Sequence, residues 1–122
     1  MKKSILKTCI LLIFLLYITE ACVDHNIGSS FIVSCDNSAT ISYSANVVPV
    51  IQTKCAIEGC HVSGTGLPDW TVLSNLQEKK SEVQRRITLP LTDPDKMPRV
   101  GSITQEERQT IYCWIQQGAL DN

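Results

Sequence analysis

Apolar residues fall into one continuous run near the start of this 122-residue chain and into periodic positions along the rest. The run, residues 10–18, follows a basic start with three lysines and is too short for an ordinary transmembrane helix. The small residue Ala21 follows it, just before the expected cleavage point. This pattern predicts a secretory signal peptide over residues 1–21, with a retained membrane anchor as the alternative.

Cys22 stands directly after Ala21, at the position where bacterial lipoproteins carry the cysteine that is lipidated. Thr19 and Glu20 depart from the aliphatic and small residues usual there, and simple cleavage is the alternative. Lipidation is favoured because a lone thiol is a liability in an exported protein. Residues 22–40 are mostly turn formers and small polar residues, which predicts a lipid-anchored tether.

Two features of this tether bear on the domain that follows it. The apolar patch at residues 31–33 is expected to dock near Cys35. His25 is interpreted as a solvated loop histidine rather than a distal ligand. The folded domain is expected over residues 41–122, so the chain holds one small domain.

Helical periodicity in residues 41–122 predicts an all-α fold of about three helices. The first helix is expected to start after an N-cap at Asn46 and run toward Lys54, with Pro49 tolerated in its first turn. The second is expected from Thr71, with charged residues on its solvated side. Its apolar face would consist of Val72, Leu76, Val83 and Ile87.

Three prolines and a glycine interrupt the pattern over residues 88–103 and predict a long loop. The third helix follows and has the clearest signals. Thr104 and Glu107 have the spacing of a capping box, and Gly118 stands where a C-terminal cap is expected. Its apolar stripe would consist of Ile111, Trp114 and Ile115.

Composition adds two constraints. The chain has a formal net charge of −1, and loss of residues 1–21 removes three lysines and one glutamate to leave −3. No basic cluster typical of nucleic-acid binding is present in the sequence. A domain of roughly eighty residues with few aromatic side chains buries a small core. Such domains usually need covalent cross-links or a bound metal for stability.

Two cysteines and a histidine share one short segment between the first two predicted helices, residues 55–61 with the sequence CAIEGCH. A cysteine, a gap and then Cys-His is the pattern of covalent c-type haem attachment. Each thiol adds across one vinyl group of the haem, and the histidine becomes the proximal iron ligand. Gly59 supplies backbone freedom within the gap. A plain disulfide is one alternative; a zinc site is another, although no second Cys/His pair stands at a matching distance.

This segment and its surroundings resemble small class-I-like c-type cytochromes over residues 41–122. The closing residues 112–119, with Trp-Ile and Gly-Ala, look like those of envelope cytochromes from the Bacteroidetes and planctomycete lineages. Four residues separate the two cysteines, where the usual gap is two. The resemblance implies a cytochrome c-like domain around one haem c, bound covalently to Cys55 and Cys60, with His61 as proximal ligand.

The same resemblance assigns the sixth iron ligand to Met97, on the proline-stiffened loop ahead of the last helix. A lone methionine is more often a gap-filler in a core. Trp70 has two interpretations that stay open here. It contacts the haem, by packing on the ring or by donating its indole N–H to a propionate, or it fills the core.

The remaining cysteines can be assigned by elimination. With residues 1–21 removed, lipid on Cys22 and haem on Cys55 and Cys60, Cys35 and Cys113 are left as a pair. We therefore expect a disulfide between the start and the end of the domain, and two separate buried thiols are the alternative.

These assignments predict an electron-transfer protein and not an enzyme. His61 and Met97 would occupy both axial positions of the iron, which leaves no open site for oxygen or peroxide. The expected partners are redox proteins of the cell envelope or periplasm and the membrane, through the N-terminal lipid, with no nucleic acid. The haem-free chain is expected to be largely unfolded.

Two alternatives belong to other functional classes. If Met97 does not bind iron, a five-coordinate haem c would suit a sensor or a peroxidase-like subunit. If no haem is attached, the chain would be a disulfide-stapled lipoprotein that binds another protein.

Overall fold

The computed structural model describes residues 34–35 and 39–122. The predictions made for residues 1–21, Cys22, His25 and the 31–33 patch lie outside these residues. Within them the chain forms helices and no strand, which agrees with the predicted all-α class. The elements are the π-helical turn η2 (Tyr43–Val47), α2 (Val48–Lys54), α3 (Leu73–Glu78), α4 (Lys80–Ile87) and α5 (Gln105–Gln116).

The first helix begins at Tyr43, and the prediction that Asn46 is its N-cap is wrong. Ser42 has that role, because its Oγ accepts a hydrogen bond from the N–H of Ala45 at 3.2 Å. Asn46 reaches back instead, and its Oδ1 accepts from the N–H of Ser42 at 2.9 Å. The helix opens with the wider π-turn η2 and becomes α-helical at Val48, one residue before Pro49, which has no N–H to donate.

The predicted second helix is two helices, α3 and α4, that meet at Lys79 with φ −96° and ψ 10°. Val72 precedes α3 in extended conformation and is exposed, so its predicted place on the apolar face is wrong. Leu76 and Ile87 are buried as predicted, and Val83 packs against the core from the side. No glycine or proline marks the break at Lys79, so the sequence pattern predicted a continuous helix.

Helix α5 agrees with its prediction at both ends. Thr104 Oγ1 accepts from the N–H of Glu107 at 3.1 Å, and Glu107 Oε2 accepts from the N–H of Thr104 at 2.7 Å. This is the predicted capping box. Gly118 follows the last turn with φ 104° and donates to the carbonyl of Ile115 at 3.1 Å. Such a left-handed backbone favours glycine.

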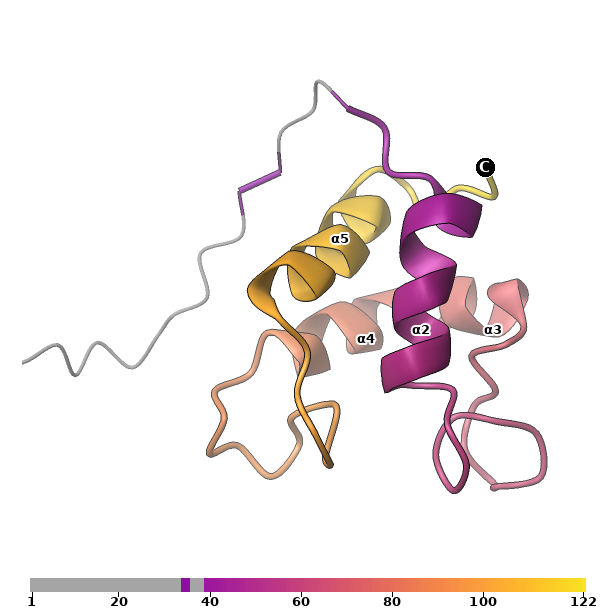
Figure 1. Cartoon of the computed structure of the whole chain (residues 1–122), viewed down its shortest axis with the longest axis vertical. Coiled ribbons are helices and arrows are strands. Elements are labelled where there is room, and N and C mark those ends of the chain that lie inside the picture. The colour runs from indigo at the N-terminus through magenta and orange to yellow at the C-terminus, as the bar shows by residue number, and fades with distance from the viewer. Residues whose placement is uncertain (1–33, 36–38) are drawn as a thin grey trace, which may run out of the picture.

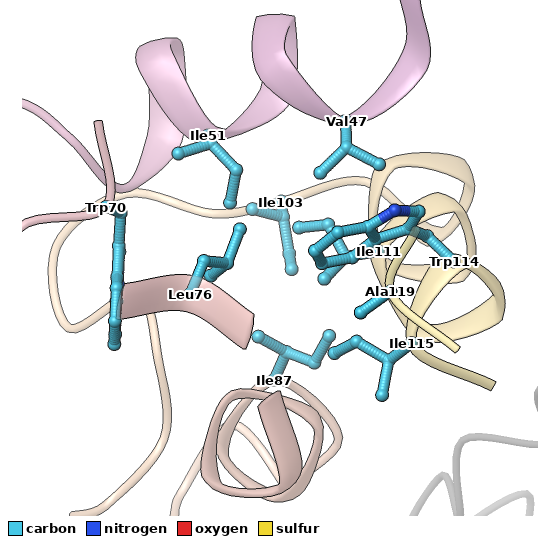
Figure 2. Close-up of a cluster of buried hydrophobic side chains, with 10 residues drawn as sticks. All are labelled: Val47, Ile51, Trp70, Leu76, Ile87, Ile103, Ile111, Trp114, Ile115 and Ala119. Atoms are coloured by element: carbon cyan, nitrogen blue, oxygen red, sulfur yellow. The ribbon is translucent and has the colours of Figure 1, made fainter. Parts of the chain in front are cut away.

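The core is a single cluster of ten buried apolar side chains from every described helix and from the segments that flank them (Figure 2). Figure 2 shows Ile87 opposite Ile115 of α5, and Leu76 between Trp70 and Ile103, all beneath the η2–α2 helix. Its size agrees with the small core expected from composition. The members are Val47, Ile51, Trp70, Leu76, Ile87, Ile103, Ile111, Trp114, Ile115 and Ala119.

A disulfide joins Cys35 to Cys113 of α5, the two cysteines left as a pair by elimination. Side chains of α5 hold the same incoming segment by hydrogen bonds. Gln109 Nε2 donates to the carbonyl of Ser34 at 2.7 Å, and the Nε2 of Gln117 donates to that of Ala39 at 2.9 Å. The described residues of the predicted tether are therefore held along one helix.

Two long loops extend from the same end of the helical body (Figure 1). We call residues 55–72, between α2 and α3, the cysteine loop, and residues 88–103, between α4 and α5, the methionine loop. At the opposite end, Asn122 lies beside the start of η2. The carbonyl of Asn122 accepts from the N–H of Ser44 at 3.0 Å. The loops and the closing residue thus lie at opposite ends of the domain.

Candidate functional site

Backbone hydrogen bonds close the first part of the cysteine loop into a compact turn. Cys55 ends α2, and its N–H donates to the carbonyl of Ile51 at 2.9 Å. The N–H of Cys60 donates to the carbonyl of Ile57 at 2.9 Å, and that of His61 donates to the carbonyl of Cys55 at 3.1 Å. The two cysteines and the histidine are therefore held together by the main chain itself.

The four-residue gap is accommodated by a local bulge toward solvent. Ile57, Glu58 and Gly59 are exposed, whereas Cys55 and Cys60 are half-buried. Gly59 has φ 77°, a left-handed conformation that a residue without a Cβ adopts at little cost. The extra residues therefore leave the closure of the turn between Cys55 and His61 intact.

Cys55 and Cys60 are free thiols in the structure, so it does not contain the disulfide considered as an alternative. Cys55 packs against the hydrophobic core. Burial, followed by the proximity of Cys60 and Glu107, raises the pKa of Cys55 to about 11. An enzyme that uses a cysteine thiolate as nucleophile needs a lowered thiol pKa, so Cys55 is unsuited to that role.

The ring of His61 is oriented by a backbone carbonyl. Its Nδ1 lies 2.9 Å from the carbonyl oxygen of Pro68, and because a carbonyl only accepts, Nδ1 carries the proton. Nε2 then keeps its lone pair. Metal-binding histidines usually donate their other ring nitrogen in this way, which fixes the tautomer.

The surroundings of His61 also favour its neutral form. Burial lowers the pKa of His61, and the Arg86 charge lowers it further, while the hydrogen bond to Pro68 acts in the opposite direction. Neutral imidazole is the form that binds metal.

Trp70 stacks on His61, with ring centroids 4.6 Å apart and planes inclined by 18°. The N–H of Trp70 donates to the carbonyl of His61 at 3.0 Å, so side chains and backbone pair the same two residues. The two interpretations of Trp70 from the sequence, haem contact and core filling, do not include its stacking on His61. The role of the Pro68 carbonyl was also missed. A proline seven residues after the histidine was the only available signal.

Met97 lies on the methionine loop, half-buried, and is anchored to α4. Its N–H donates to the carbonyl of Arg86 at 3.1 Å. The Arg86 guanidinium is held in turn by Glu82, at 2.6 Å between Nε and Oε1. Because the charge of Arg86 also acts on His61, this residue connects the surroundings of both predicted ligands. Iron binding by Met97 stays a prediction.

Exposed apolar side chains concentrate on the two loops. Among the described residues, five of the six exposed large hydrophobic residues lie there. Leu91 and Val100 are the most open, at 74% and 80% exposure. Apolar surface gathered in one region usually marks a binding site. The other three are Ile57, Leu67 and Val72.

The described part of the chain contains no group of three or more His, Cys, Asp or Glu side chains that could hold a metal ion. The zinc alternative therefore lacks a ligand set there. A haem differs, because its porphyrin supplies four nitrogens and the protein supplies at most two axial ligands. In the same residues, no helix is both long and apolar enough to cross a membrane.

Comparisons of the chain with protein-family models, with curated proteins and with solved structures find no match. Its function must therefore be inferred from its own residues and their geometry.

Proposed function

We propose that the protein is a haem c electron-transfer protein of the cell envelope, with an iron held by His61 and Met97. The observation that carries the proposal is the Nδ1 hydrogen bond of His61 to Pro68, in a loop that also holds two free thiols. It leaves the lone pair of Nε2 available, on a residue of the same closed turn that holds Cys55 and Cys60. That combination suits covalent haem attachment better than a disulfide or a metal cluster.

The residues present fit the covalent chemistry. Each S–H would add across one vinyl group, with a new carbon–sulfur bond and the proton going to the other vinyl carbon. Such an addition has no leaving group and needs reduced thiols, and both cysteines are free. The exposed apolar side chains of the two loops offer the surface that a porphyrin would cover.

Each axial residue has a separate task. His61 is kept neutral by burial and oriented by Pro68, as an iron ligand requires. Met97 would bring a neutral thioether, which favours the reduced metal and a relatively high potential. When bound, the haem supplies an iron that gains and loses one electron. If His61 and Met97 both hold the iron, no site would be open to oxygen or peroxide, so we propose no enzymatic activity.

Partners follow from this function. Redox proteins of the envelope would dock transiently over a small interface near the loops, as weak electron-transfer complexes do. A lipid on Cys22 would keep the protein at a membrane.

The test is expression of the full chain in a periplasm with haem-maturation machinery, followed by denaturing mass and reduced absorption spectra on one sample. We expect a mass increment of one haem and sharp low-spin bands. The C55A/C60A variant should lose both, whereas the matched C35A/C113A variant should keep its covalent haem. A colourless wild-type protein lacking two hydrogens per cysteine pair would exclude the proposal.

The sixth ligand needs a separate experiment. M97A should change the absorption spectrum and allow added small ligands to bind the iron. An unchanged spectrum would remove Met97 from the iron and favour the five-coordinate sensor or peroxidase-like alternative.

A further inference from the structure

We infer that Trp70 is a positioning residue for the His61 imidazole: its indole fixes the plane of the ring that the proposed function assigns to iron. This inference rests on the proposed function and adds a residue that sets the geometry of the same site.

Three contacts restrain His61 from different directions. The Pro68 carbonyl binds Nδ1 at 2.9 Å, and the Trp70 indole covers one ring face at a centroid distance of 4.6 Å. The backbone N–H of Trp70 binds the carbonyl of His61 at 3.0 Å. The hydrogen bond fixes one ring atom but leaves the ring free to tilt about it. The stacked indole removes that freedom because a tilt would open the contact.

Trp70 can act as a restraint because it is itself immobilised. Only 8% of its surface is exposed, and it belongs to the core cluster. Figure 2 shows its ring at the edge of that cluster, next to Leu76 of α3 and below Ile51 of α2. A rigid path of packed side chains therefore runs from the helices to the imidazole. A flexible surface tryptophan would offer no such support.

The expected consequence concerns the electronic structure of the site. Outer residues that orient a ligand tune the metal it binds. The plane of the axial imidazole affects the ferric low-spin electron paramagnetic resonance signal. A ring held in one orientation gives one signal, whereas a ring that samples several orientations gives a broadened or divided signal.

The experiment compares W70F and W70L in the haem-loaded full chain. Phenylalanine retains an aromatic face for stacking, whereas leucine fills core volume without one. The matched control is W114F, because Trp114 is likewise a core tryptophan that stacks on another ring, that of Tyr43 at 5.4 Å. It belongs to α5 and lies at the opposite end of the core. Covalent haem content by mass, melting temperature and the resonance spectrum are measured for each variant.

We expect W70F and W114F to keep the single wild-type signal and W70L to lose it, with haem content unchanged in all three. A purely core-filling role would lower the melting temperature in W70L and leave its signal intact, which would overturn the inference. Absence of haem from the wild-type protein would instead overturn the proposed function, so the two failures are distinguishable.

A second measurement needs no variant and decides the matter if W70L fails to assemble. In the reduced, diamagnetic wild-type protein, nuclear Overhauser effects between the His61 and Trp70 rings are expected from the stack. Their absence would refute the positioning role.

Discussion

At the scale of single residues, Glu107 links the start of one helix to the end of another. Its carboxylate accepts from the N–H of Thr104 within the capping box, and it lies 3.5 Å from Nζ of Lys54. Lys54 is the last residue of α2 and directly precedes Cys55. The N-terminus of α5 is thereby connected to the entrance of the cysteine loop.

Removal of the Thr104 cap should therefore lower the stability of the protein by a measurable amount. We expect T104A to reduce the free energy of unfolding by about 1 kcal/mol, since one N–H at the helix start loses its acceptor. Urea denaturation of T104A and wild type checks this. S102A, an exposed position two residues earlier, serves as the control and should match wild type. Equal stability of T104A and wild type would mean that water replaces the cap without cost.

Residue types and spacing predicted the cap at Thr104 and grouped Cys55, Cys60 and His61, because these signals are local in sequence. They placed the first N-cap at Asn46 because it directly precedes the apolar residues Val47 and Val48, whereas the helix starts one turn earlier, after Ser42. The stacking of Trp70 on His61 escaped prediction because it exists only after nine residues of loop have closed.

At the scale of elements, the Cys35–Cys113 disulfide fastens the segment that precedes the first helix to α5. The bond spans 78 residues of sequence, so it restricts a large part of the unfolded chain. We expect C35A/C113A to lose about 2–4 kcal/mol of unfolding free energy, because the unfolded state regains its conformational freedom. Urea denaturation measures this loss.

A reductant provides the control for that prediction. Reduction should destabilise the wild-type protein by the same amount and leave C35A/C113A unchanged. A loss in the variant without a matching loss on reduction would assign the effect to packing around Cys113, which is buried.

Helix α4 has its own electrostatic cluster, in which Glu82 contacts two arginines. Hydrogen bonds from Arg85 and then Arg86 lower the pKa of Glu82 from 4.5 to about 2. A carboxylate with a lowered pKa in the folded state stabilises that state above its unfolded pKa. This contribution is lost as pH falls from 4.5 toward about 2.

We expect wild type to be slightly more stable than E82Q near neutral pH, with the difference vanishing as pH falls through that range. The effect is small because Glu82 is exposed and its ion pairs are screened by water. Melting temperatures across the range check it, with E58Q on the cysteine loop as a control outside the cluster. A constant difference at all pH values would refute the electrostatic origin.

Helix existence and type were predictable for the strongly patterned segments, and the division at Lys79 was not. Leu76 and Ile87 both face the core, as a continuous helix would also require, so their burial does not reveal the break. Val72 appeared to extend the apolar face because valine is hydrophobic, yet Asp69 turns the chain just before it. The carboxylate of Asp69 accepts from the N–H of Thr71 at 2.9 Å and delays the helix start.

At the scale of the whole molecule, the helices share one small core and leave apolar side chains exposed on both loops. Without a haem, such a small buried core provides little stability for a domain of roughly eighty residues. We expect the haem-free C55A/C60A chain to show weak helical circular dichroism and no cooperative melting. The haem-loaded chain should show both. A cooperative, fully folded haem-free domain would contradict the proposal that haem acts as a structural staple.

The all-α class was predictable at this scale because periodicity reports secondary structure directly. The extension of both loops from one end was not, since it depends on how α2, α4 and α5 pack. Packing between distant segments has no local signature in one sequence.

The attachment of Ser34, Cys35 and Ala39 to the α5 region also determines how a force on the incoming chain would reach the domain. A pull on the incoming chain would pass through the Cys35–Cys113 bond into the middle of α5. The contacts of Ser42 and Ser44 with Asn122 lie on the same side of the domain, away from both loops. If the protein is anchored and transfers electrons as proposed, a force on the anchor would enter the domain on this side, and the geometry of the His61 loop would stay constant.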